Sequence, residues 1–148
     1  MILAALLLAQ LATPDIVGRA SVIDGDTIEI TGQRIRIHGI DAPESRQECT
    51  AGGTSWRCGQ QSALELSAWI AASVVTCRQV ATDRYKRVVA RCSVRGEDLG
   101  RWSVSQGWAL DWPQYSRGEY QGAQEQAKAA GVGMWRGTFT EPWIWRKK

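Results

Sequence analysis

The stretch TIEITGQRIRIHGIDAPES, residues 27–45, contains two strand patterns joined by a turn. In its second half, Ile35 and Ile37 alternate with polar residues, which is the period-2 pattern of a half-buried strand. The tripeptide TGQ at 31–33 is short and carries the glycine expected of a hairpin turn. After Gly39 the pattern stops, and two acids flank a proline at 41–44. We therefore expect a hairpin whose second strand ends in an acidic loop.

The segments on either side of this hairpin predict a small α+β domain. GRASVIDGD (18–26) reads as a preceding strand, and two apolar runs within 75–94 read as a second hairpin. Helical spacing of apolar residues predicts a helix over Gln60–Val74 and a short helix near 98–106. Ser116 and Glu119 form a capping-box pattern that predicts a third helix, running to about Ala130 and ended by glycine. Residues 45–59 are expected to be a Gly-rich loop, and ALDWPQY (109–115) irregular. About five short strands favour a closed OB-fold barrel.

The first twelve residues, MILAALLLAQLA, are almost wholly apolar. A bilayer span needs about 20 residues, so the run is too short to cross a membrane. It is typical of the apolar region of a secretory signal, with a buried strand or a misplaced start codon as alternatives. We therefore expect a signal peptide at 1–13 and one domain at 14–148, and a secreted or periplasmic protein.

Four cysteines agree with export. In a hairpin centred between residues 84 and 85, Cys77 and Cys92 lie directly opposite each other, which suits a cross-strand disulfide. Cys49 and Cys58 lie close together in the loop, so we favour the two local pairings among the three possible ones. The alternative, a zinc site, lacks a C-x2-C pair, and the one histidine is far away in the sequence.

The acidic loop suggests a cation site. Pro43 holds Ala42 extended, which can present the Ala42 carbonyl beside the Asp41 carboxylate. Asp26 precedes the strand that pairs with 34–40 and is expected to approach Asp41 across the sheet. Oxygen ligands of this kind suit Ca²⁺. Glu44 follows the proline and can orient or deprotonate a water molecule.

Neighbouring residues point to an anionic substrate. Arg36 lies on the polar face of the same strand, and the DRYKR segment offers Arg84 and Arg87 to grip a phosphoryl group from another side. Asp24 is interpreted as a turn former rather than a ligand. His38, the only histidine, is interpreted as a surface residue rather than a general base. The net charge of +3 permits a polyanionic partner without requiring one.

These motifs together resemble the staphylococcal-nuclease-like thermonuclease family. The elements are IDGDT, an arginine five residues before an aspartate, DAPE, DRYKR, SQGWAL and AQEQAKAAGVGMW, in that order. The resemblance covers roughly residues 17–136 and implies an OB-fold barrel with three helices. It also implies Ca²⁺-dependent hydrolysis of phosphodiester bonds in DNA or RNA. The oligomeric state stays open, with a monomer as the default expectation.

Residue by residue, the resemblance implies three groups of site positions. Metal ligands are Asp26, Asp41 and the Ala42 carbonyl; catalytic residues are Arg36, Glu44 and Arg87; substrate-binding residues are Arg84, Tyr85 and Tyr115. Lys86 departs from the family, since the position before the catalytic arginine is often glycine. If it requires positive φ, Lys86 strains the turn. Two alternatives remain: a non-catalytic OB-fold module that binds nucleic acid, and a protein of cell-envelope or polysaccharide assembly. The preference for DNA or RNA stays open.

Overall fold

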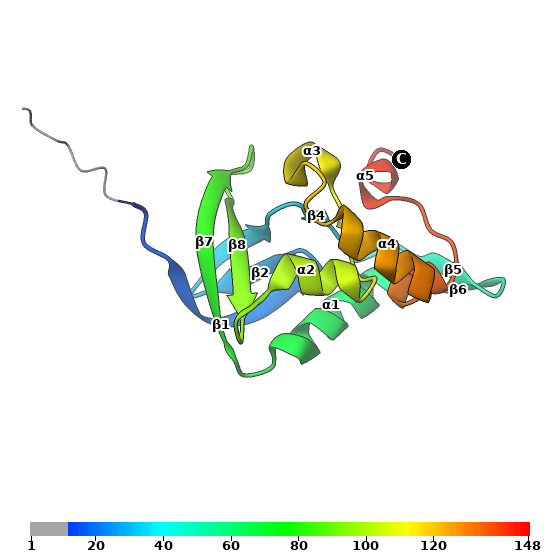
Figure 1. The fold of residues 1–148 in the computed structure, drawn as a ribbon, viewed down its shortest axis with the longest axis horizontal. Coiled ribbons are helices and arrows are strands. Elements are labelled where there is room, and N and C mark those ends of the chain that lie inside the picture. The colour runs from blue at the N-terminus through cyan, green and yellow to red at the C-terminus, as the bar shows by residue number, and fades with distance from the viewer. Residues whose placement is uncertain (1–11) are drawn as a thin grey trace, which may run out of the picture.

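A computed structural model describes residues 12–148. Its centre is a closed five-stranded barrel, made of β1 (Ile16–Asp24), β2 (Thr27–Ile30), β3 (Gln33–Ile37), β7 (Val74–Thr82) and β8 (Val88–Val94). Neighbouring strands are antiparallel, and a parallel pairing of β3 with β8 closes the barrel. β9 (Glu97–Asp98) extends the sheet beyond β8. The predicted α+β barrel is confirmed (Figure 1). Most of the expected signal segment, residues 1–11, lies outside the described residues.

The alternation seen in the opening stretch builds the barrel interior. Ile28 and Ile30 of β2 and Ile35 and Ile37 of β3 are all buried. They pack against Val75 of β7 and further residues of one continuous core. Since successive strand residues point to opposite faces, Glu29 and Arg36 point away from this core, and of the two only Glu29 is partly exposed, because Arg36 is buried on its own side.

Three helices of seven or more residues cover the barrel: α1 (Cys58–Ile70), α2 (Leu99–Ser105) and α4 (Gln121–Ala130). The helix predicted over Gln60–Val74 ends earlier, because Ala71 has a φ of 49° and Val74 already begins β7. Leu64, expected on its core face, is 55% exposed. α2 lies where it was predicted, and α4 ends at Ala130 with Gly131 left-handed, also as predicted.

The predicted capping box is wrong. Ser116 ends the short helix α3 (Pro113–Ser116), and its hydroxyl donates to the Asp111 carboxylate. Glu119 instead forms an ion pair with Arg91 at 2.7 Å. The α4 helix therefore begins four residues later than expected, with Tyr120 instead of Ser116 at the N-cap and Gln121 as its first residue.

Two segments expected to be irregular contain short elements. Residues 45–59 include a hairpin of β5 (Cys49–Ala51) and β6 (Thr54–Trp56). ALDWPQY contains β10 (Leu110–Asp111), which pairs with β4 (Ile40–Asp41). The chain then ends in η1 (Gly133–Arg136) and the single-turn helix α5 (Pro142–Trp145). In Figure 1, α5 lies at the same upper side of the molecule as α3.

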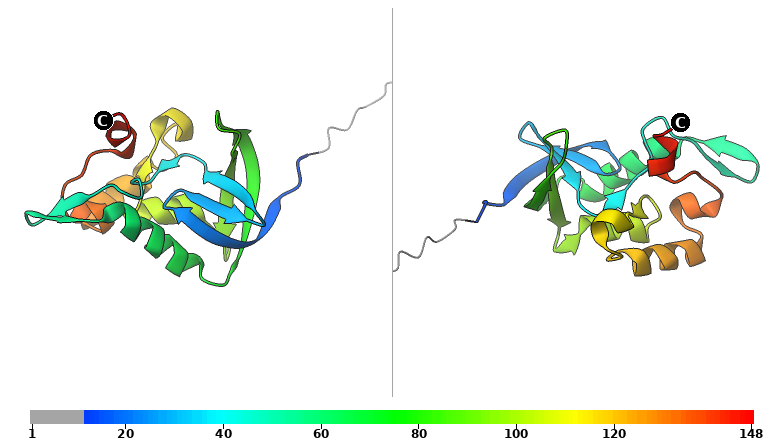
Figure 2. Two further views of the ribbon diagram at one scale, coloured as in Figure 1. Left: turned by 180° about the vertical axis from the view of Figure 1, so that it is seen from behind. Right: turned by 90° about the horizontal axis from the view of Figure 1, so that it is seen from above.

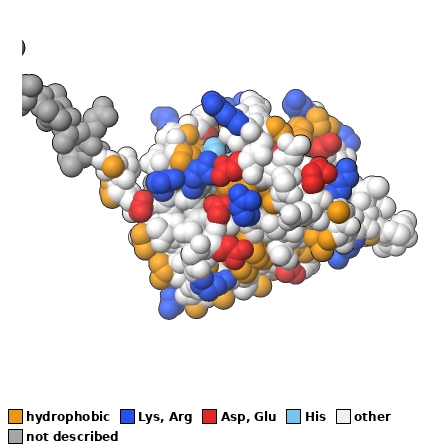
Figure 3. Space-filling model, viewed as in Figure 1, with side chains coloured by type: hydrophobic (Ala, Val, Ile, Leu, Met, Phe, Trp, Pro, Cys, Tyr) orange, Lys and Arg blue, Asp and Glu red, His pale blue; other side chains and the backbone are white. Residues whose placement is uncertain are grey.

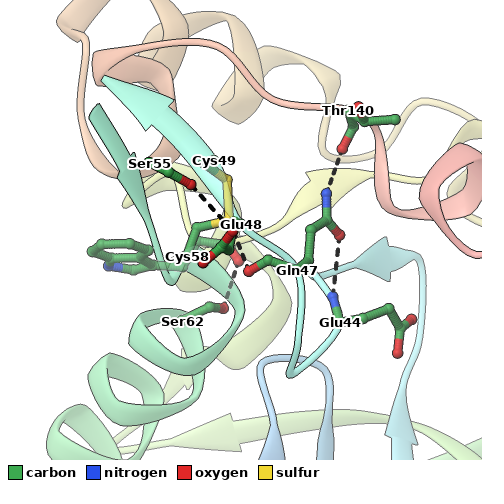
Figure 4. Close-up of a disulfide and its surroundings, with 9 residues drawn as sticks. Glu44, Gln47, Glu48, Cys49, Ser55, Cys58, Ser62 and Thr140 are labelled. Atoms are coloured by element: carbon green, nitrogen blue, oxygen red, sulfur yellow. Dashed lines mark hydrogen bonds between the residues drawn. A yellow bond between two sulfur atoms is a disulfide. The ribbon is translucent and has the colours of Figure 1, made fainter. Parts of the chain in front are cut away.

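Both predicted disulfides are present. Cys77 and Cys92 face each other across β7 and β8, and the hairpin register holds until a bulge between Gln79 and Ala81. Cys49–Cys58 joins the β5 strand to the start of α1 (Figure 4). With all four cysteines in disulfides, the zinc alternative has no thiolate ligands.

A second, smaller core lies outside the barrel. Cys49, Cys58, Leu110 and Met134 form it, and tail aromatics including Trp135 and Trp143 pack against it. The two views of Figure 2 show the β5–β6 hairpin and the C-terminal segment at the same end of the molecule. The tail therefore packs on this disulfide-anchored cluster. Within residues 12–148, no helix has the length and apolar character needed to cross a membrane.

Candidate active site

Two short strands and a turn place the aspartates. Asp26 lies in the turn between β1 and β2, and the carbonyl of Asp26 accepts a hydrogen bond from the amide of Ile37 at 2.9 Å. Asp41 lies in β4, opposite Leu110 of β10, and its side chain is fully buried. The left-handed φ of 79° at Gly39 turns the chain from β3 into β4. The hairpin and the β4–β10 pair therefore carry the two acids to one side of the barrel.

Arg36 lies between these aspartates. Its Nη1 is 3.2 Å from an Asp26 oxygen and its Nη2 is 3.4 Å from an Asp41 oxygen. Asp26 also accepts a hydrogen bond of 2.8 Å from the amide of Ala42. The structure thus brings Asp26, Arg36, Asp41 and Ala42 together, as the strand pattern predicted. Ala42 contributes its amide to this network.

Burial and charge shift the pKa values of the acids in opposite directions. Burial alone would raise the pKa of Asp26, but the Arg36 guanidinium and hydrogen bonds lower it below its ordinary value. Burial raises the pKa of Asp41 to about 6, against the lowering effect of the hydrogen bond from Arg146. Burial and the adjacent Asp26 charge raise the pKa of Asp24 to about 8. Three acids are therefore crowded where their negative charges oppose one another.

Asp24 also has the turn role that the sequence indicated. Its Oδ1 accepts a hydrogen bond of 3.1 Å from the amide of Asp26, two residues on. This bond fixes the loop that presents the Asp26 carboxylate.

Sequence reasoning missed Arg146. Its two terminal nitrogens each donate to one oxygen of Asp41 at 2.8 Å, and Nη1 also donates to Glu44 at 2.8 Å. These hydrogen bonds, above all those to Asp41, raise the pKa of Arg146 above its ordinary value. The residue lies 105 positions after Asp41, so no local pattern reveals the contact. The only signal in the sequence is the basic C-terminal end, Arg146 to Lys148, which by itself indicates no particular partner.

Glu44 lies at the exposed edge of this cluster. Its amide donates to the Oε1 atom of Gln47 at 3.2 Å, while Gln47 Nε2 donates to the carbonyl of Thr140 at 2.6 Å (Figure 4). The Gln47 side chain is buried, so it connects the acidic loop firmly to the C-terminal segment. The Glu44 carboxylate itself faces solvent and Arg146.

The predicted second arginine lies on the turn between β7 and β8. Arg87 Nε donates to the carboxylate of Asp83 at 2.7 Å. Within residues 12–148 its terminal nitrogens make no hydrogen bond, and no contact joins Arg87 to Asp26, Asp41 or Glu44. Lys86, directly before it, has a φ of 63°, so the position does require the conformation that favours glycine.

The residues predicted to contact the substrate lie on two exposed aromatic surfaces, one around Tyr85 and one around Tyr115. Tyr85 is 64% exposed, and the guanidiniums of Arg84 and Arg87 lie 4.9 and 5.5 Å from its ring centre. Tyr115 is 50% exposed and packs edge-on against Trp112. Stacking on a nucleotide base needs such accessible ring faces.

Trp112 connects the Tyr115 surface to the buried charges. Its ring centre lies 5.5 Å from the Arg36 guanidinium and 5.4 Å from that of Arg146. The Trp143 ring lies parallel to it, at a centroid distance of 6.3 Å. Trp112 is thus part of the site itself and not only of the core.

His38 lies away from the cluster. Partial burial, with the nearby Arg91 charge, lowers its pKa. In Figure 3 the single pale blue side chain lies among intermixed basic and acidic groups. The histidine thus has neighbours other than Asp26 and Asp41, in line with the interpretation that it is not the general base.

The residues present suit a hard cation in their chemistry. Asp26 and Asp41 are oxygen donors, and their crowding is relieved by positive charge. Arg36 and Arg146 supply that charge in this structure. No group of three or more His, Cys, Asp or Glu side chains within residues 12–148 is arranged to hold a metal ion. A metal ion would therefore need Asp41 to be released by Arg146.

Comparison with known proteins gives this geometry a family. Residues 34–137 match the model of the family described as staphylococcal nuclease homologue. The chain belongs to the staphylococcal nuclease family. The matched segment begins at Arg34 in β3 and includes Arg36, Asp41, Glu44 and Arg87, whereas Asp26 precedes it.

Three curated relatives align over most of the chain. A succinoglycan biosynthesis protein, ExoI, of Rhizobium meliloti is 45% identical over 91% of this chain and 73% of its own length. An uncharacterized endonuclease of Escherichia coli is 31% identical, over 90% of this chain and 87% of its own length. Another from Haemophilus influenzae is also 31% identical, over 86% and 70% respectively.

Proposed function

We propose that this protein is a Ca²⁺-dependent phosphodiesterase that hydrolyses DNA or RNA. The observation that carries the proposal is the buried Arg36 held between Asp26 and Asp41, with Glu44 at the exposed edge. Burying a charged triad of this kind is costly for stability alone, so its retention favours a chemical role. Family membership and the relatives named endonucleases support the reaction class.

The proposed mechanism assigns each residue a task. Asp26, Asp41 and the Ala42 carbonyl would hold Ca²⁺, which when bound supplies positive charge to a phosphate oxygen. Glu44 accepts a proton from the attacking water. Arg36 donates hydrogen bonds to the phosphoryl group as negative charge builds on it.

Arg87 would complete the grip from the β7–β8 turn. Asp83 holds its Nε, which leaves the two terminal nitrogens for bidentate hydrogen bonds to a phosphate. Tyr85, Tyr115 and Arg84 would contact the adjoining nucleotides, with Tyr85 and Tyr115 offering exposed rings for stacking. Unpaired strands expose base faces, so single-stranded or frayed nucleic acid is the expected substrate.

We infer further that the protein works outside the cytoplasm as a monomer. Two disulfides support an oxidising compartment, secreted or periplasmic. The apolar segment at 1–13 is proposed as the export signal, with residues 14–148 as the functional domain.

Cleavage of heat-denatured DNA and of RNA tests the proposal. The oxidised protein lacking residues 1–13 is incubated with Ca²⁺ or with chelator, alongside Glu44→Gln, Arg87→Ala and the control Arg78→Ala from the outer part of the barrel. We expect cleavage only with Ca²⁺, a loss of about a hundredfold or more in each site variant, and normal cleavage by the control. Near-normal activity in folded Arg87→Ala would contradict the assigned role.

The alternative is a nucleic-acid-binding module without activity, and the ion pairs of Arg146 are the observation that favours it. A charge-filled site could bind a strand without cutting it. Binding of oligonucleotides without any cleavage, with Ca²⁺ saturating and the protein folded, would establish that alternative.

A further inference from the structure

The C-terminal helix α5 carries an internal cation into the site. Arg146 directly follows α5 and engages both oxygens of Asp41, plus one of Glu44, through hydrogen bonds of 2.8 Å. A bidentate arginine–carboxylate pair is among the strongest hydrogen-bonded ion pairs in proteins. Asp41 has no exposed surface in this arrangement, in which the Arg146 guanidinium lies on both of its oxygens.

The segment before Arg146 is fixed to the same site at two points. The buried Gln47 holds the Thr140 carbonyl, and the Trp143 ring lies parallel to Trp112. These anchors keep the arginine within reach of Asp41 at all times, which gives it a high effective concentration. Arg146 itself has about a third of its side chain exposed, so the guanidinium can leave Asp41 without unfolding the anchors.

We propose that Arg146 is a tethered competitor of the catalytic cation, so that the C-terminal segment 141–148 lowers the affinity of the site for Ca²⁺ and restricts activity to high Ca²⁺ concentrations. This inference rests on the proposed function for the identity of the cation. Arg146 occupies one lone pair on each Asp41 oxygen, and its positive charge repels a cation brought to the same carboxylate, so the two compete there. Weak Ca²⁺ binding suits an exported protein, because extracellular modules bind Ca²⁺ at about 10⁻⁴–10⁻³ M.

A metal-binding measurement tests the proposal without any substrate. Tb³⁺ serves as the luminescent probe, since Trp112 lies beside the site and can sensitise it, and Ca²⁺ affinity follows from competition and from calorimetry. The variant is Arg146→Gln. The matched control is Lys147→Gln, which removes the same charge one residue later and, within residues 12–148, breaks no ion pair.

We expect Arg146→Gln to bind Ca²⁺ at least about tenfold more tightly, because no guanidinium then competes for Asp41. The Ca²⁺ affinity of the control should stay within twofold of the wild type. A second pair covers the case of a misfolded variant: chains ending at residue 145 and at residue 146 should differ in the same way. Equal Ca²⁺ affinity of the wild type and Arg146→Gln would overturn the proposal.

Cleavage assays on the same proteins separate this inference from the proposed function. Tighter Ca²⁺ binding in Arg146→Gln, with no cleavage by any variant, would support competition by Arg146 and contradict the proposed nuclease activity. If the wild type cleaves in a Ca²⁺-dependent manner but Arg146→Gln has the same Ca²⁺ affinity as the wild type, the nuclease activity is supported and competition by Arg146 is contradicted. Slower cleavage in Arg146→Gln at unchanged Ca²⁺ affinity would also overturn the proposal and make Arg146 a substrate ligand.

Discussion

Lys86 provides a test of how the chain tolerates the turn that positions Arg87. It has a φ of 63°, and its amide donates to the Asp83 carbonyl at 3.0 Å, so the turn imposes this conformation. The Lys86 side chain is exposed and makes no hydrogen bond or ion pair within residues 12–148. Replacing it with glycine therefore removes a strained Cβ and no side-chain hydrogen bond or ion pair.

The expected gain follows from two opposing effects. A non-glycine residue in the left-handed region costs about 1–2 kcal/mol. Glycine loses about 0.5–1 kcal/mol more in backbone entropy on folding. Lys86→Gly should thus raise the free energy of unfolding by about 0.5–1 kcal/mol, which for a chain of this size raises Tm by about 2–3 °C.

Urea unfolding of the oxidised protein measures this difference, with Lys86→Ala as control. Alanine removes the same charge but keeps the Cβ, so it should remain as strained as lysine. Cleavage by Lys86→Gly should stay normal, because Asp83 holds Arg87 through its side chain and its amide. If the glycine variant is no more stable than the alanine variant, the positive φ carries no cost and the reasoning fails.

Two further predictions concern stability. Burial would raise the pKa of Asp83, but hydrogen bonds from the Arg87 amide and guanidinium lower it overall, so its stabilisation is present above the unfolded pKa and is lost as the pH falls through the folded pKa. Asp83→Asn should therefore cost about 1 kcal/mol at pH 7 and progressively less as the pH falls through the folded pKa, as measured by urea unfolding; a cost that does not change with pH would refute the ionic origin. Replacing Cys77 and Cys92 by alanine should cost about 3 kcal/mol, since the disulfide closes a sequence separation of 15 residues. A loss below 1 kcal/mol in the same denaturation assay would mean that the disulfide does little to restrict the unfolded chain.

The sequence by itself determined the barrel hairpins and the core of the site. Period-2 alternation at 27–37 specifies the four isoleucines of the core, although Thr27 and Arg36 on the other face are buried as well. Strand pairing is short-range there, so Asp26 and Arg36 could be brought together from pattern alone. The opposition of Cys77 and Cys92 followed in the same way from hairpin register. The bulge beyond Gln79 was not predicted, since a single extra residue leaves no pattern.

Only the tertiary structure decided where α1 ends, where α4 begins and what fills the site. The Ser116–Glu119 pattern matched a capping box, yet Ser116 bonds to Asp111, five residues earlier, and Glu119 pairs with Arg91, which is distant in sequence. Likewise nothing local marks Arg146, because its partner Asp41 lies more than a hundred residues earlier and meets it only when the tail packs on the disulfide-anchored second core. Periodic burial is encoded within a few residues, whereas ion pairs between distant segments depend on how those segments pack.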